Sequence, residues 1–249
     1  MLIVLLAMLA LSACGDDDND NGLTEIPDIN PENFDWDIYI LDIAGDDRED
    51  YYYVTCDWLG NEDAITEQDQ FSIQFNDAEP IILSGWGWFG EWSFSAEAFL
   101  SPGTNYNVKL LKNSVQVTSG NIKTAYRAYG NFPSYYNPTT TAELSWTLSD
   151  NNQYQVAGVS SYSEDYEDYD DAMEDLDPSD RTYTIPANAV QHFGDYTEYE
   201  LLIMEMNFTQ NGRTAFMAVQ GSSNYYESIP AKDVAQNLLT HARKLRKQM

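Results

Sequence analysis

Apolar and polar side chains alternate with a period of two residues over most of the chain that follows Pro31. The alternation is clearest in five stretches, 51–58, 71–75, 92–98, 106–110 and 142–148. In the first of them Tyr52, Val54 and Cys56 share one face. This pattern is typical of strands with one buried face, because successive side chains of a strand point to opposite sides. Short strands at these intervals predict an all-β sandwich.

The dipeptide Asn113-Ser114 lies between two alternating runs. Asn and Ser favour tight turns, because their short side chains bond to nearby backbone groups and Asn also tolerates a left-handed backbone. We therefore expect a hairpin here, with Val115 and Val117 on the buried face of its second strand.

The last part of the chain changes to a helical period. Ala235, Leu238, Ala242 and Leu245 fall on one helical face, and four Lys and Arg residues follow near the predicted helix end. Residues 229–249 are therefore predicted to form a basic amphipathic helix. Two roles stay open for it, a cap on the preceding sandwich or a docking element for the protein's own acidic loops or for a partner.

The first 13 residues form an apolar run that leads directly into Cys14. A transmembrane helix needs about 20 apolar residues, so a cleaved signal peptide over 1–13 fits better. The motif Leu11-Ser12-Ala13-Cys14 resembles the bacterial lipobox, which implies that Cys14 becomes a lipidated N-terminus that holds the protein on a membrane. Signal peptides begin with basic residues, and this chain departs from that pattern because its first Lys or Arg is Arg48.

Residues 14–33 open with a run of aspartates and contain few apolar side chains. Such a segment buries too little surface to offset the entropy of folding, so we expect a solvated tether. The acidic run also resembles the stretch that directs some lipoproteins of Bacteroidota-like bacteria to the outer face of the outer membrane. The resemblance implies a surface-exposed envelope protein, and a plain spacer is the alternative.

The stretch LSPGTNY at 100–106 carries a more specific signature. Leu100, Pro102, Thr104 and Tyr106 resemble the Leu-x-Pro-x-Thr-x-Tyr motif that leads into strand F of fibronectin type III domains. The resemblance implies that the Tyr106 hydroxyl bonds to the backbone of the preceding loop, which is the tyrosine corner of such sandwiches. It also implies that Trp58 is the core tryptophan of strand B, and that residues 34–126 form one fibronectin type III-like sandwich.

Residues 127–228 repeat this layout less closely. Trp146 and Tyr199 lie 53 positions apart, against 48 positions for Trp58 and Tyr106. The similar spacing predicts a second sandwich, but the Leu-x-Pro-x-Thr part is missing before Tyr199. The second unit therefore resembles fibronectin type III domains and other immunoglobulin-like sandwiches equally. The expected fold is all-β, with two tandem fibronectin type III or immunoglobulin-like β-sandwiches and a short C-terminal helix.

The chain contains 41 acidic and 12 basic residues, a net charge of −29 at pH 7. Such a charge repels phosphate groups, so nucleic acid is not an expected partner. With Cys14 lipidated, Cys56 has no partner for a disulfide within the chain. We interpret Cys56 as a small buried hydrophobe of a strand, with a reactive thiol or an intermolecular bridge as the alternative.

The stretch 85–92 places Trp86, Trp88, Phe89 and Trp92 among three glycines. Exposed aromatic rings beside carboxylates can bind carbohydrate, because the rings stack on the apolar faces of sugars. These four residues are the candidate ligand-binding site. The alternative interpretation is a cross-strand aromatic ladder that completes the core.

Residues 164–180 contain ten carboxylates and no basic side chain. A block of like charges is typical of a solvated loop. Carboxylates in this number could also collect Ca²⁺, but the segment lacks the spacing of an EF-hand loop. No metal site is assigned.

Catalytic motifs are not found in the sequence. His192 and His241 are the only histidines, and no nucleophile elbow, phosphate-binding loop or dinucleotide fingerprint occurs. We expect a protein without catalytic activity or cofactor that binds or adheres at the cell envelope, with a glycan or an envelope protein as partner. The alternative is a structural accessory lipoprotein of an envelope assembly.

Overall fold

The computed structural model describes residues 35–43, 51–60, 64–88, 91–163, 168–193 and 197–225. Within these ranges the regular structure consists of 15 β-strands, and no α-helix occurs there. The all-β prediction is confirmed. The predicted signal peptide, Cys14, the acidic tether, Phe89, His241 and the predicted C-terminal helix lie outside the described residues.

The first eight strands form a sandwich of two layers. They are β1 (Trp36–Ile43), β2 (Tyr51–Trp58), β3 (Phe71–Phe75), β4 (Ile81–Ile82), β5 (Ser84–Trp88), β6 (Glu91–Phe99), β7 (Asn105–Lys112) and β8 (Val115–Lys123). Their orders, β1-β2-β6-β5 and β4-β3-β7-β8, correspond to strands A-B-E-D and C′-C-F-G of an immunoglobulin-like sandwich. Ile38, Cys56, Ile73 and Leu110 are among the buried residues between the layers.

The other seven strands form a second sandwich, which also has two layers. They are β9 (Tyr129–Asn131), β10 (Ala142–Thr147), β11 (Tyr154–Tyr162), β12 (Tyr169–Leu176), β13 (Thr182–Ile185), β14 (Glu198–Asn211) and β15 (Thr214–Tyr225). Their orders, β13-β10-β9 and β12-β11-β14-β15, correspond to E-B-A and C′-C-F-G. Leu144, Trp146, Val159 and Leu201 contribute to the core between them. The two tandem sandwiches expected from the sequence are therefore present.

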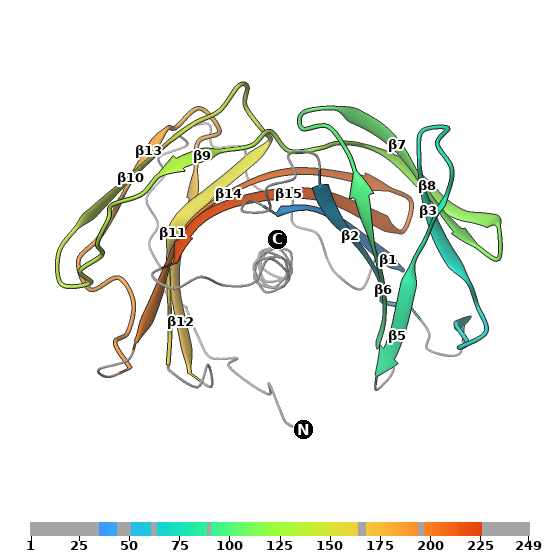
Figure 1. Cartoon of the computed structure of the whole chain (residues 1–249), viewed down its shortest axis with the longest axis horizontal. Helices are drawn as coiled ribbons and strands as arrows, with labels where there is room; N and C mark the ends of the chain where they lie inside the picture. The colour runs from blue at the N-terminus through green and yellow to red at the C-terminus, as the bar shows by residue number, and fades with distance from the viewer. Residues whose placement is uncertain are drawn as a thin grey trace, which may run out of the picture.

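A parallel pairing of β1 with β15 joins the two sandwiches into one body. The register runs from Trp36 opposite Thr214 to Ile43 opposite Gly221. One layer of each sandwich thereby becomes half of a single sheet with the order β12-β11-β14-β15-β1-β2-β6-β5. This long sheet arches across the molecule, and the two smaller sheets lie on its outer side, one toward each end (Figure 1).

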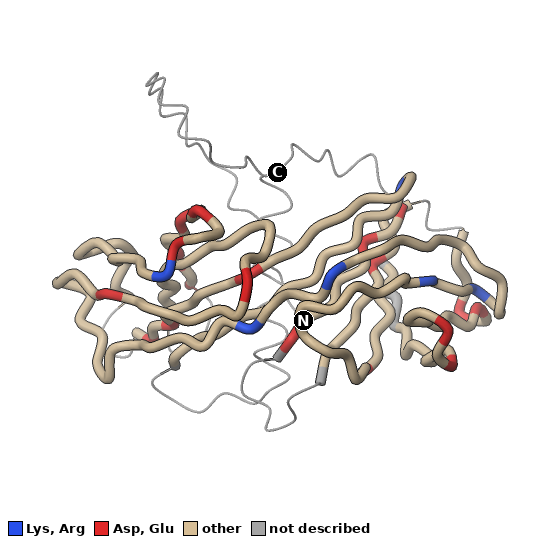
Figure 2. Tube along the Cα trace, turned by 90° about the horizontal axis from the view of Figure 1, so that it is seen from above, with Lys and Arg blue, Asp and Glu red and all other residues tan. Residues whose placement is uncertain are grey.

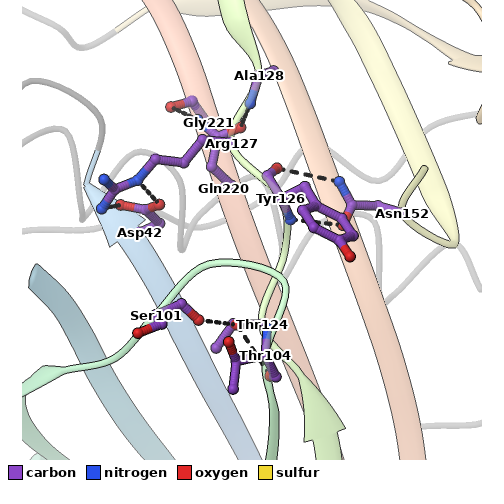
Figure 3. Close-up of polar contacts among 10 residues, drawn as sticks. All are labelled: Asp42, Ser101, Thr104, Thr124, Tyr126, Arg127, Ala128, Asn152, Gln220 and Gly221. Atoms are coloured by element: carbon purple, nitrogen blue, oxygen red, sulfur yellow. Dashed lines mark hydrogen bonds and ion pairs between the residues drawn. The ribbon is translucent and has the colours of Figure 1, made fainter. Parts of the chain in front are cut away.

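The chain crosses from the first sandwich to the second through residues 124–128 on the outer side of the long sheet (Figure 3). Asn207 donates from Nδ2 to the carbonyl oxygens of Lys123 and Thr124 at 3.1 and 3.4 Å. Asn152 accepts from the Tyr126 N–H at 2.8 Å and donates to the Tyr126 carbonyl at 3.2 Å. These four bonds hold the linker backbone against the second sandwich.

Two further side chains complete this linker clamp, which consists of Asp42, Asn152, Asn207 and Gln220. The Ala128 N–H donates to Gln220 Oε1 at 2.7 Å. Arg127 forms a two-pronged ion pair with Asp42, with Nε–Oδ2 and Nη2–Oδ1 distances of 2.5 and 3.0 Å. Since Asp42 belongs to β1 and Gln220 to β15, the clamp fixes the linker to strands of both sandwiches.

The tyrosine corner forms as expected from the 100–106 motif. The Ser101 N–H donates to the Tyr106 hydroxyl oxygen at 2.9 Å, and the Tyr106 ring packs edge-on against Phe75 with centroids 5.8 Å apart. In the second sandwich the Tyr199 hydroxyl lies 2.7 Å from Nδ1 of His192, at the start of β14. Tyr199 thus reaches back to the preceding loop through a side chain instead of a backbone group.

The burial of most strands follows the alternation in the sequence. Tyr52, Val54 and Cys56 are fully buried in β2, and burial raises the pKa of the Cys56 thiol. This agrees with the interpretation of Cys56 as a buried hydrophobe. The hairpin turn also forms, since Asn113 and Ser114 have φ values of 52° and 66°.

The expected burial of Val115 and Val117 is wrong. Both side chains are exposed, at 67% and 44%, whereas Gly120 and Ile122 of the same strand are buried. A register shift between Leu110 and Leu111 of β7 interrupts the regular pairing beside this hairpin tip. The bulge and the tip position leave Val115 and Val117 beyond the layer that would cover them.

Candidate ligand-binding site

Three tryptophans lie side by side on neighbouring strands of the first sandwich. Trp36 of β1 pairs with Trp58 of β2, and Trp58 pairs with Trp92 of β6. Neighbouring strands are about 4.8 Å apart, and the ring centroids of Trp36 and Trp58 are 4.9 Å apart. We call these three residues the tryptophan row.

The tryptophan row borders the core of the sandwich without being fully enclosed. Trp36 is buried, while Trp58 and Trp92 are half-buried and pack against the core. The Trp92 ring lies parallel to that of Phe94, with centroids 6.1 Å apart and an interplanar angle of 6°. The structure therefore supports the aromatic-ladder interpretation for Trp92, and it also leaves part of two rings accessible.

Two cavities flank the row. One of about 420 Å³ is lined by Trp92, Phe94, Glu67 and Asp69, and also by Leu83 and Thr66. The other, of about 570 Å³, is lined by Trp36, Trp58, Asp35, Lys112 and Arg213 among others. Each cavity thus combines an indole ring with charged side chains, which is the composition expected of a site for a polar ligand with apolar faces.

Fixed charges line both cavities. Asp69 accepts bonds from Lys112 Nζ at 2.9 Å, the Thr66 N–H at 2.8 Å and Asn113 Nδ2 at 2.9 Å. The bond from Lys112 and those from the Thr66 backbone and Asn113 hold the pKa of Asp69 well below its usual range. On the other side Arg213 pairs with Asp35 at 2.8 Å. Glu67 is exposed and lines the smaller cavity.

Gly85 shapes the wall of the smaller cavity. A Cβ atom at this position would lie 2.4 Å from Cδ1 of Phe94, which is closer than any side chain can approach. The absence of a side chain at Gly85 therefore lets the Phe94 ring lie directly against the backbone of β5. Close packing of this kind agrees with the aromatic-ladder interpretation of the stretch 85–92.

The four residues of the sequence-predicted site do not form one group. Trp92 is paired with Gly87, whereas Trp86 is paired with Ser93 and Trp88 with Glu91. Because alternate positions belong to opposite faces of a sheet, positions 86 and 88 fall on the other face from Trp92. Trp36 takes their place beside Trp58 and Trp92, and it was missed because only the pairing register brings it there.

The acidic segment 164–180 contains a strand, so its prediction as a loop is wrong over 169–176. These residues form β12, which pairs with β11 at the edge of the long sheet. Carboxylates on an edge strand discourage pairing with other chains. Among the described residues no group of three or more His, Cys, Asp or Glu is placed to hold a metal ion.

No family model matches the chain, and no curated protein matches it. Among solved structures, the chain is similar to the FN1-FN3 domains of chicken CNTN1, with 10% identity and a TM-score of 0.30, over 78% of this chain and 64% of that chain. The strand orders of the two sandwiches are those of fibronectin type III-like domains. The described residues include no helix with the length and apolarity to cross a membrane.

Proposed function

We propose that the protein is a non-catalytic binding or adhesion protein of the cell envelope, with carbohydrate as its ligand class. The observation that carries the proposal is the tryptophan row with a charged cavity on each side. Indole rings offer flat apolar surfaces for stacking, and Glu67, which lines one of the cavities, offers an acceptor for ligand hydroxyl groups. The net charge of −29 favours neutral over anionic glycans as ligands.

A glycan array followed by titration calorimetry with the full chain tests this site. Trp92→Ala is expected to weaken binding about tenfold or more, because a central aromatic contact is worth at least 1.4 kcal/mol at such sites. Tyr135→Ala is the matched control, since Tyr135 is 73% exposed on the second sandwich. Circular dichroism shows whether each variant is folded. An array without any bound glycan, or equal affinity of the two variants, contradicts the carbohydrate site.

The proposal places the protein on the outer membrane through a lipid on Cys14, with exposure at the cell surface. Its support is the lipobox-like Leu11-Ser12-Ala13-Cys14 and the acidic run that follows it. Cys14→Ser is expected to move the protein from the membrane fraction to the soluble fraction and to abolish labelling with an alkynyl fatty acid. Cys56→Ser is the control, because Cys56 is buried within the first sandwich. If Cys14→Ser fractionates with the membrane as the wild type does, the proposed lipid anchor at Cys14 is contradicted.

A structural accessory role in an envelope assembly is the second candidate. The joined sheet and the linker clamp favour it, because they give a tandem of fixed geometry suited to a spacer. Cross-linking and mass spectrometry on intact cells separate the two candidates. A spacer is expected to copurify with the same envelope proteins whether or not Trp92 is replaced, whereas an adhesin loses its ligand.

A further inference from the structure

The inner side of the long sheet, opposite the two smaller sheets, carries a continuous apolar surface. Its members, which we call the inner-face cluster, are 0–9% exposed and come from four adjacent strands: Tyr39, Leu41, Tyr154, Val156, Leu202, Met204, Met206, Ala215, Met217 and Val219. Tyr53 of β2 and Met173 of β12 pack against its edges. The surface therefore extends across the middle of the arch in Figure 1.

The inner-face cluster is distinct from both sandwich cores. Met217 alternates along β15 with Phe216 and Ala218, which belong to the core of the first sandwich. Likewise, Met204 alternates along β14 with Ile203, which belongs to the core of the second. The central strands are thus buried on both faces, although both smaller sheets pack on the outer face.

The residues of the inner-face cluster are buried in a single chain, so other atoms of the same chain must cover them. Among the described residues, the strands of the smaller sheets contact the outer side of the long sheet. We propose that the segment 231–249 of this chain docks on the inner-face cluster as an amphipathic helix. The cover is then intramolecular, and no second copy is needed.

The apolar face of the segment matches the surface in character and size. Ala235, Leu238, Ala242 and Leu245 form one helical stripe that can pack on Met204 and Met217. A helix over 231–249 would be about 28 Å long at about 1.5 Å per residue. The five neighbouring strands from β11 to β2 span about 19 Å. The apolar stripe itself, from Ala235 to Leu245, is about 15 Å long, which matches the distance of about 14 Å across the four strands of the cluster, from β11 to β1.

Charge favours this segment over the other long part of the chain outside the described residues. Asp37, Asp57 and Glu200 lie on the same inner face and are 3%, 7% and 2% exposed. The segment 231–249 supplies 5 of the 12 Lys and Arg residues, whereas six of the others are spread over the described strands and loops (Figure 2). The acidic tether 14–33 would be repelled by these carboxylates.

Photocrosslinking in the full chain tests the docking directly. Leu238 is replaced by p-benzoylphenylalanine, which reacts preferentially with methionine, and Thr240 on the opposite side of the predicted helix is the control position. We expect crosslinks from position 238 to peptides that contain Met204, Met206 or Met217 in the same chain, and only background from position 240. Crosslinks to residues 14–34, crosslinks between two chains, or equal products from both positions would overturn the proposal.

A pair of charge substitutions provides the second measurement. Leu238→Asp places a carboxylate against the apolar surface, and we expect a fall in Tm of about 5–10 °C with increased binding of a hydrophobic dye. Thr240→Asp adds the same charge on the solvent side and is expected to resemble the wild type. Equal behaviour of the two variants contradicts the docking, whereas glycan binding by the tryptophan row is not affected by either result.

Discussion

Arg127→Met is expected to lower the free energy of unfolding by about 3–5 kcal/mol, because it leaves the Asp42 carboxylate buried without its ion pair. Asp42 is fully buried, and the Arg127 guanidinium binds both of its oxygens. The Tyr52 ring, 6.0 Å from the guanidinium, is buried as well, and burial together with the charge of Asp42 raises the pKa of its hydroxyl. The Asp42 side chain has no exposure to solvent, so water compensates poorly for the lost cation. Urea denaturation followed by tryptophan fluorescence measures the change.

Arg213→Met is the matched control for this prediction. Arg213 also forms an ion pair, with Asp35, but its side chain is 60% exposed and that of Asp35 36%. An exposed pair of this kind contributes about 0–1 kcal/mol. The double variant Arg127→Met with Asp42→Leu is expected to regain much of the lost stability, since no unpaired charge stays buried. Equal losses for Arg127→Met and Arg213→Met would show that burial of Asp42 does not decide the effect.

Much of the fold could be predicted because local sequence patterns determine the strands and turns. The two-residue alternation of 51–58 and 71–75 gives strands with one buried face, and the spacing of Leu100 to Tyr106 gives the tyrosine corner. These signals depend on neighbours within one strand or one turn. Bonds such as that from the Ser101 N–H to Tyr106 follow from them directly.

The joining of the sandwiches could not be predicted in the same way. Trp36 pairs with Thr214 across most of the chain, and no local pattern specifies which distant strand a given strand will meet. One signal was present, however. Apolar residues occupy both faces of β1 and β14, in Ile38–Leu41 and in Leu201–Met204, which is typical of strands that are covered on both sides. This signal points to the inner-face cluster.

The candidate site also has one part that a local pattern predicted and one part that depends on the pairing of distant strands. Trp92 could be singled out because it lies in an aromatic stretch with glycines, but its partners Trp36 and Trp58 come from two other strands. The strand β12 was not predicted, for a different reason. Its many carboxylates suggest a loop, yet an edge strand tolerates them because one of its sides faces solvent.

Glu205→Gln is expected to remove a pH dependence from the stability of the protein. Glu205 is fully buried below the linker, where Asn152 donates to Oε2 at 3.1 Å. Oε1 has no hydrogen-bond partner among the described residues. Burial, which outweighs the bond from Asn152, raises the pKa of Glu205 to about 8. The carboxyl group is therefore largely protonated at neutral pH in the folded protein.

The sign of the effect follows from the two protonation states. Below pH ~4.5 the side chain is protonated in both the folded and the unfolded chain, so its contribution to stability is fully present. Between pH ~4.5 and ~8 only the folded chain keeps the proton, and the contribution is lost as pH rises. Glutamine has the shape of the neutral acid and no proton to lose. Relative to the wild type, Glu205→Gln should thus gain on the order of 3–5 kcal/mol between pH 5 and 8.

Denaturation curves of the wild type and Glu205→Gln at several pH values measure this gain as a difference. The repulsion among the many carboxylates of the chain changes with pH too, but it is nearly the same in both proteins and cancels. Glu143→Gln is the control for the removal of one charge, because Glu143 is exposed on β10. A difference between Glu205→Gln and the wild type that stays constant from pH 5 to 8 would mean that Glu205 is ionised in the folded protein.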